Sequence, residues 1–76
     1  MEIYKNLNGN SGVTHYVIGD DFIVAKFYGK TSKYKYSNLI TGKMHVEKMK
    51  QLAVNGRGLR TYITTTDWVK NNFTRY

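Results

Sequence analysis

The side chains with the clearest chemical potential are the lysines and tyrosines that alternate in one short run, Lys33-Tyr34-Lys35-Tyr36. Successive side chains of a β-strand point to opposite faces, so both lysines would project to one side and both tyrosines to the other. Lysines neutralise phosphates, and an exposed aromatic ring can stack on a base of any identity. The run therefore points to single-stranded nucleic acid. Alternating lysines also keep a sheet face hydrated and protect an edge strand from unwanted pairing, so a purely structural role stays open.

A second candidate follows about twenty residues later, in Gly56-Arg57-Gly58-Leu59-Arg60. Two glycines let the backbone turn sharply and approach a ligand closely, and the forked guanidinium groups of Arg57 and Arg60 suit phosphate oxygens. A helix end followed by a turn would explain the glycines equally well. The segment adds two candidate phosphate contacts.

The residue types needed for catalysis do not form a recognisable grouping. His15 and His45 are expected in different elements, and Asp20 and Asp21 are adjacent in a turn, where Asp is favoured because its side chain bonds nearby amides. The chain has no cysteine, which excludes disulfides and thiolate-bound zinc. No glycine-rich segment has the spacing of a nucleotide-binding loop. We expect a non-catalytic protein without a metal site or a cofactor.

The length and net charge of the chain further limit its functional class and the kind of partner it can have. The 76 residues suffice for one domain that buries about 60% of its unfolded surface, which leaves little room for a large cleft. Twelve Lys and Arg against five Asp and Glu give a net charge of +7, which favours an anionic partner such as a nucleic acid. An acidic protein partner is the alternative, and an apolar patch around Val17, Phe22 and Val24 would then matter more than the lysines.

The chain shows neither a signal peptide nor the run of about 20 apolar residues that a spanning helix needs. We therefore expect a cytoplasmic protein without membrane contact. The oligomeric state is left open.

Three segments have the composition of strands, and two turns separate them. They cover residues 13–18, 22–28 and 32–37, with Gly19-Asp20-Asp21 and Gly29-Lys30-Thr31 between them. This order predicts a three-stranded antiparallel meander. The first twelve residues are rich in Asn and Gly, so we expect a flexible lead-in over residues 1–12 and a single domain over residues 13–76.

Sorting the strand residues by alternation separates a core row from a solvent row. The expected core row contains Tyr16, Ile18, Ile23, Ala25, Phe27, Tyr34 and Tyr36. The opposite row contains His15, Val17, Phe22, Val24, Lys26, Tyr28, Lys33 and Lys35. Burying three unpaired lysines would cost several kcal/mol each, so the second row should face water or a ligand.

The period changes to that of a helix over residues 43–54. An apolar arc is formed there by Val46, Met49, Leu52 and Ala53. We expect Thr41 as the N-cap and Gly56 as a left-handed C-terminal stop. Beyond it, residues 66–73 predict a short C-terminal helix or an irregular tail. The expected fold is thus α+β, a meander packed on one amphipathic helix.

Two of these segments resemble the KTSC domain family, small modules found at the C-terminus of some lysyl-tRNA synthetases and as stand-alone bacterial proteins. The resemblance rests on Tyr34-Lys35-Tyr36, on residues 45–53, on Gly56-Arg57-Gly58-Leu59 and on Tyr62-Ile63. It implies a stand-alone member of that family. It also implies RNA binding, because the family occurs fused to lysyl-tRNA synthetases. Arg60 departs from the family pattern, which has Asn in many relatives, and residues 64–76 follow the pattern only loosely.

Together these observations predict a small basic module that binds nucleic acid, with RNA favoured, through a lysine-rich sheet face and a Gly-Arg-Gly turn. The candidate contacts are Lys26, Tyr28, Lys33, Lys35, Arg57 and Arg60. The alternative is a protein-interaction or accessory module of phage or mobile-element origin.

Overall fold

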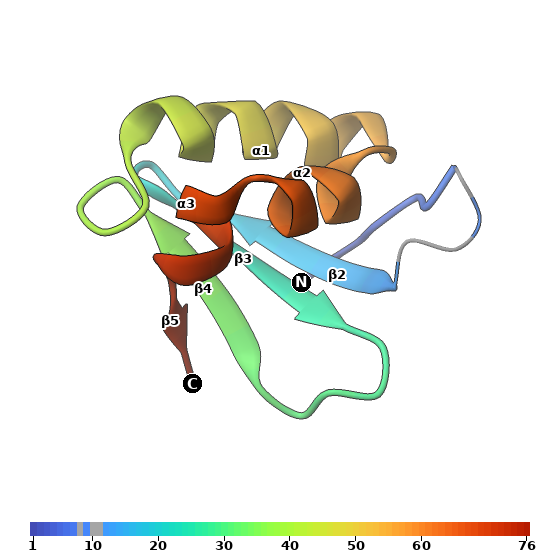
Figure 1. Cartoon of the computed structure of the whole chain (residues 1–76). Coiled ribbons are helices and arrows are strands. Elements are labelled where there is room, and N and C mark those ends of the chain that lie inside the picture. Colours follow the sequence, from blue (N-terminus) through green and yellow to red (C-terminus); the bar gives the residue numbers. More distant parts are fainter. Residues whose placement is uncertain (8, 10–11) are drawn as a thin grey trace.

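The chain folds into two layers, a five-stranded antiparallel sheet and a layer of helices that covers one of its faces (Figure 1). The computed structural model describes residues 1–7, 9 and 12–76. The strands follow one another in the sheet in chain order and are β1 (Glu2–Ile3), β2 (Val13–Ile18), β3 (Phe22–Phe27), β4 (Lys33–Ser37) and β5 (Thr74–Arg75). The helices are α1 (Lys43–Asn55), α2 (Leu59–Thr65) and α3 (Asp67–Asn71).

The α+β class is confirmed, but the expected meander on one helix describes only the centre of the fold. β2, β3 and β4 lie in the middle of the sheet, while β1 and β5 add an edge strand on each side. Two-residue strands are too short to show an alternating pattern, so the sequence did not indicate them. α2 was also missed, although Leu59, Tyr62 and Ile63 have helical spacing, because seven residues next to two glycines make a weak signal.

The long helix α1 has the expected extent and C-terminal stop, but its N-cap differs from the prediction. Gly56 ends the helix in the left-handed conformation, with φ of 80°, and its N–H donates to the carbonyls of Leu52 and Ala53. The N-cap residue is Gly42 rather than Thr41. The hydroxyl of Thr41 donates instead to the carbonyl of Asn72 (2.5 Å), so this side chain joins the start of α1 to the end of α3.

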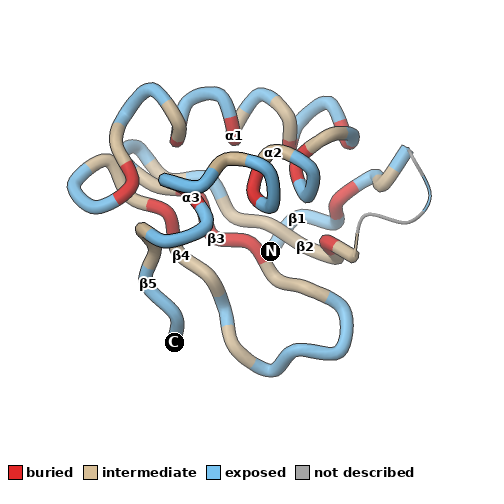
Figure 2. Tube along the Cα trace, in the orientation of Figure 1, coloured by how far each residue is buried: buried red, intermediate tan, exposed pale blue. Residues whose placement is uncertain are grey.

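The core lies between the sheet and the helices, as the red segments of Figure 2 show. Its fully buried members from strands and helices include Ile23, Ala25, Tyr36, Val46, Met49, Leu59 and Val69. The expected core row therefore does face the helices. Its exception is Ile18, which is 40% exposed at the end of β2. On the opposite row Val24 is only 3% exposed, which the alternation did not predict.

A change of register near the start of β2 brings one more residue into the core. Val13 pairs with Phe27, but His15 pairs with Lys26, so the strand has an extra residue at this point. A bulge of this kind reverses the alternation that precedes it. Val13 is consequently 2% exposed and packs in the core, although strict alternation would have turned it away.

The predicted lead-in has a part that is docked on the domain. Glu2 and Ile3 pair with Tyr16 and His15 of β2, and Tyr4 is 3% exposed within the core. The expectation of a loosely held segment came from the Asn- and Gly-rich composition around residues 6–12, of which Asn8, Asn10 and Ser11 lie outside the described residues. In the part of the chain that is described, no helix has the length and hydropathy needed to cross a membrane.

Candidate nucleic-acid interface

The sheet face turned away from the helices carries the three predicted lysines. Lys26 and Lys33 are direct partners in the pairing of β3 with β4, and His15 is the partner of Lys26 on β2. Lys35 lies two pairs further along, opposite Val24. Residues opposite one another in an antiparallel pair share a face. Three strands thus present His15, Lys26, Lys33 and Lys35 on one surface, hereafter the lysine face.

Apolar side chains support the lysines on this surface. The ammonium group of Lys35 lies 4.7 Å from the ring centroid of Phe22, within the range of a cation–π contact. Val24 is almost fully buried, and Val17 and Phe22 are half-buried. Lys35 therefore covers part of the apolar surface that an alternative protein partner was expected to use.

Among the described residues, no acidic side chain forms an ion pair with a lysine of the lysine face. The five acids of the chain are placed elsewhere, in the edge strand β1, in the turn between β2 and β3, and in the helices, as Glu2, Asp20, Asp21, Glu47 and Asp67. Glu2 is paired with Tyr16, which puts it on the row that faces the helices. Two like charges directly opposite each other destabilise a sheet. An anion bound between Lys26 and Lys33 would relieve that repulsion.

An aromatic side chain that the sequence analysis did not select completes the lysine face. Tyr76 and Lys33 exchange two backbone hydrogen bonds, of 2.7 and 2.9 Å, which continues the pairing of β5 with β4. The ammonium group of Lys33 lies 5.6 Å from the Tyr76 ring centroid, and Tyr76 is 60% exposed. Its ring is available for stacking. Only the pairing of the last residues with β4 reveals this position, and that pairing leaves no signal in the sequence.

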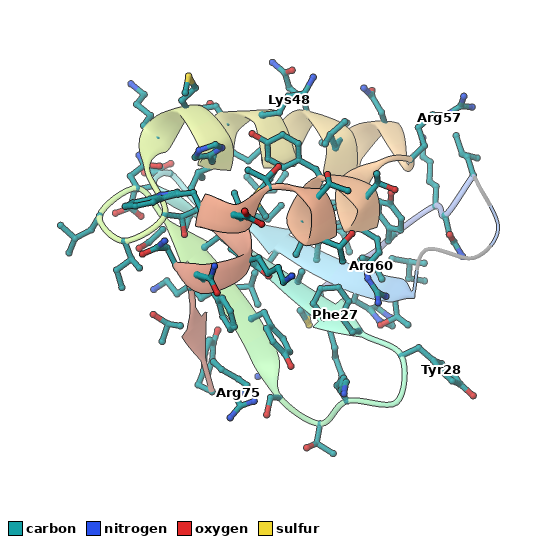
Figure 3. The ribbon with its side chains drawn as sticks, in the orientation of Figure 1. Phe27, Tyr28, Lys48, Arg57, Arg60 and Arg75 are labelled. Carbon is teal, nitrogen blue, oxygen red and sulfur yellow. The ribbon has the colours of Figure 1, made fainter. Side chains whose placement is uncertain are left out.

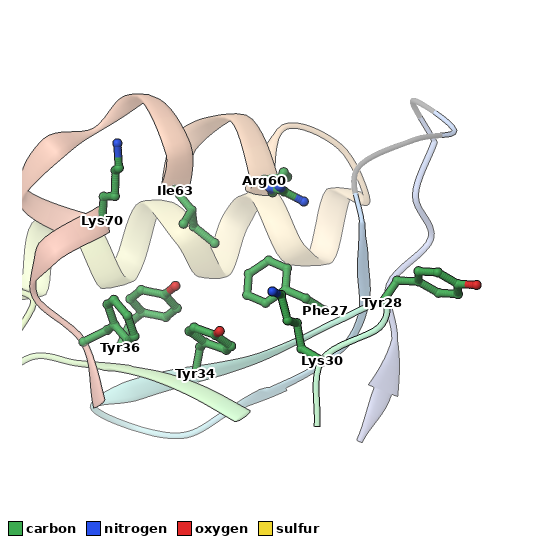
Figure 4. A pocket seen from close by; sticks show the side chains of 9 residues that line it. Phe27, Tyr28, Lys30, Tyr34, Tyr36, Arg60, Ile63 and Lys70 are labelled. Atoms are coloured by element: carbon green, nitrogen blue, oxygen red, sulfur yellow. The ribbon is translucent and has the colours of Figure 1, made fainter. Parts of the chain in front are cut away.

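The aromatic contact that the sequence did predict, Tyr28, lies outside the lysine face. It follows β3 in the turn that leads to β4 and is 83% exposed. Tyr28 reaches away from the body of the domain (Figures 3 and 4).

The two predicted arginines lie in the helix layer and not with the lysines (Figure 3). Arg57 is exposed in the turn between α1 and α2. Arg60 belongs to α2, and its guanidinium carbon lies 5.7 Å from the ring centroid of Phe27, on the sheet face that the helices cover. The residues brought together are therefore Lys26, Lys33 and Lys35, and the two arginines lie apart from them. The cause is α2, which turns the residues after Gly58 onto the core side of the sheet.

Two ionisable groups on the helix side of the sheet, His45 and Tyr36, are held within the packed part of the fold. His45 Nδ1 and the hydroxyl of Tyr62 share a hydrogen bond of 2.7 Å that joins α1 to α2. Burial raises the pKa of Tyr36 far above its usual value, and the neighbouring Tyr34 raises it further. Among the residues described, no three His, Asp or Glu side chains are grouped so that they could hold a metal ion.

No protein-family model, no curated protein and no solved structure matches the chain. The resemblance to KTSC modules therefore stays a prediction.

Proposed function

We propose that the protein is a non-catalytic module that binds single-stranded nucleic acid, preferably RNA, on the lysine face. The observation that carries the proposal is a sheet face with three lysines on neighbouring strands, over which the described part of the chain places no acidic side chain and no helix. Such a surface attracts a phosphate backbone and gives it several closely spaced cations.

The aromatic side chain beside the lysines supports a single-stranded ligand. A base can stack on Tyr76 only when it is not paired and stacked within a duplex, whereas the lysines would accept phosphates of either form. The resemblance of Tyr34-Lys35-Tyr36 and the Gly-Arg-Gly turn to KTSC modules supports RNA over DNA. We also propose that the protein is cytoplasmic, because RNA is available to it in that compartment.

The test is a fluorescence anisotropy titration of labelled single-stranded and duplex RNA. We expect tighter binding of the single strand, and we expect Tyr76→Leu to weaken it by about five- to tenfold, the lower part of the range for loss of one stacked base. Trp68→Leu, which removes an exposed aromatic ring from the helix layer, is the control and should change little. Equal affinity for both RNA forms, or equal effects of the two substitutions, would contradict stacking on the lysine face. No binding of either RNA would refute the proposal.

One observation favours the alternative function, docking of a protein partner. Exposed apolar side chains gather around the start of α1, where Leu39 is 94%, Met44 77% and Trp68 55% exposed. The indole N–H of Trp68 donates to the carbonyl of Thr41, which fixes this ring beside the loop that carries Leu39. Purification of the tagged protein from its host separates the two functions. Nuclease treatment should remove the co-purifying molecules if they are held by nucleic acid and leave them if Leu39 and Trp68 hold a protein.

A further inference from the structure

A cavity of about 320 Å³ opens on the helix side of the sheet, between β3 and β4 on one side and α2 and α3 on the other (Figure 4). Its floor is a chain of four aromatic rings, in the order Phe27, Tyr34, Phe73 and Tyr36. The ring centroids of Phe27 and Tyr34 are 5.1 Å apart, those of Tyr34 and Phe73 5.2 Å, and those of Phe73 and Tyr36 5.7 Å. The rings of Tyr34 and Phe73 are inclined by 35° to each other and are only half-buried, so they offer aromatic surface to a ligand in the cavity.

Three cations border the same cavity. Lys30 comes from the turn after β3, Arg60 from α2 and Lys70 from α3. Figure 4 shows Lys30 reaching toward the Phe27 ring, on which Arg60 also packs, while Lys70 comes from the helix layer farther along. Lys30 and Lys70 are exposed, and neither forms an ion pair within the described part of the chain. One end of the aromatic floor therefore carries two positive charges.

An aromatic floor with a cationic end fits a ligand that has both a planar ring and an anion. The cavity volume lies at the lower end of the range of about 300–1,000 Å³ found for small-molecule sites, so it would hold one such unit and not several. A phosphate monoester carries about −1.5 to −2 charges at neutral pH, and two cations match it better than a singly charged phosphodiester.

We propose that this cavity binds one nucleotide with a 5′-phosphate, its base on the rings of Tyr34 and Phe73 and its phosphate between Lys30 and Arg60. The inference rests on the proposed function, because such a nucleotide would be the first one of the strand that lies on the lysine face. The connection is short, since Lys26 and Lys33 are the last pair before the turn that contains Lys30. A strand could pass around this turn from one face of the sheet to the other.

The experiment is a titration of the isotope-labelled protein with adenosine 5′-monophosphate, followed by amide NMR. We expect shifts at Phe27, Lys30, Tyr34 and Phe73 and saturation below roughly 10 mM. Adenosine and inorganic phosphate should each bind at least about tenfold more weakly, because each makes only half of the contacts. Lys30→Gln lies in an exposed turn and should weaken the nucleotide about fivefold or more without affecting the fold.

Arg60→Gln and Arg57→Gln form the matched pair of variants. The first removes a cation from the cavity and should weaken adenosine 5′-monophosphate, whereas the second removes an equal charge from the neighbouring turn and should not. The inference is overturned if no shifts appear, if they cluster instead around His15 and Lys26, if inorganic phosphate binds as tightly as the nucleotide, or if both arginine variants act alike.

This result can be separated from the test of the proposed function. Lys33→Gln with Lys35→Gln should weaken oligonucleotide binding and leave the titration with the mononucleotide unchanged. Loss of the mononucleotide signal with intact oligonucleotide binding would refute only the cavity, and the reverse pattern would refute only the lysine face.

Discussion

Removing two charges from the lysine face should change how RNA binding depends on salt. The variant is Lys33→Gln with Lys35→Gln, and the matched control is Lys43→Gln with Lys48→Gln, which removes two exposed lysines from α1. Lysines that neutralise phosphates release counterions, so the logarithm of the binding constant falls linearly with the logarithm of the salt concentration.

The magnitude follows from the number of lysines on the face. With about 0.7 counterions per contact on a single strand, the three lysines give a slope of about −2.1, and affinity should fall about 18-fold between roughly 50 and 200 mM salt. One remaining lysine gives a slope of about −0.7 and a loss of about 2.6-fold over the same range. We take the electrostatic contribution to the binding constant to be zero near 1 M salt, where both proteins then bind equally. On that basis the double variant binds about 65-fold more weakly than the wild-type protein at 50 mM and about tenfold more weakly at 200 mM.

Fluorescence anisotropy with a short labelled RNA at four or more salt concentrations measures this slope. Thermal unfolding of each variant confirms that the fold is kept, which matters because the ammonium group of Lys35 packs on the ring of Phe22. Equal slopes for the wild-type protein and the double variant would refute contact between the lysine face and phosphates. Equal losses in the two double variants would show that only the net charge of +7 is at work.

The remaining predictions concern stability and are all measured by urea unfolding. Because burial raises the pKa of Tyr36, this side chain ionises above about pH 10 in the unfolded state but not in the folded one. The free energy of unfolding should therefore fall above that pH by up to about 1.4 kcal/mol per pH unit. In Tyr36→Phe the free energy should fall less steeply with pH, and parallel curves for the two proteins would contradict this. Gly56→Ala should lower the free energy of unfolding by about 2–3 kcal/mol, because φ is 80° and the new Cβ would lie 2.5 Å from the Cβ of Lys5. Gly29→Ala should lower it by about 1 kcal/mol, because φ is 77° there but the space is open. Equal losses in the two variants would show that the contact with Lys5 does not crowd the new Cβ. Thr41→Val should cost about 0.5–1.5 kcal/mol, because the part-buried carbonyl of Asn72 loses its donor, and a neutral result would remove that role.

The parts of the fold that could be predicted are those in which apolar and polar residues repeat regularly over several turns of a helix or along a strand. Alternation over residues 33–37 placed Tyr36 in the core and Lys33 and Lys35 together on the other face, and the helical arc through Val46 and Met49 located α1. Both periods extend over enough residues to outweigh local exceptions.

The parts that could not be predicted depend on contacts between distant segments. The bulge before His15 and the edge strands β1 and β5 are set by pairing partners. The same holds for the candidate site: the sequence grouped the lysines correctly within the sheet, but the placement of Arg60 depends on which face α2 covers. Tyr76 reaches the lysine face only through its pairing with Lys33.

The segment that leads from β1 to residue 7 also joins the two layers of the molecule mechanically. The N–H of Leu7 donates to the carbonyl of Gly56 (2.7 Å), and the hydroxyl of Tyr4 accepts from the N–H of Leu59 (3.4 Å). A strand at the edge of the sheet is thereby fastened to the corner between α1 and α2. Movement of the helices relative to the sheet would have to break these two hydrogen bonds. The amide protons of Leu7 and Leu59 should therefore exchange with solvent only when the layers separate.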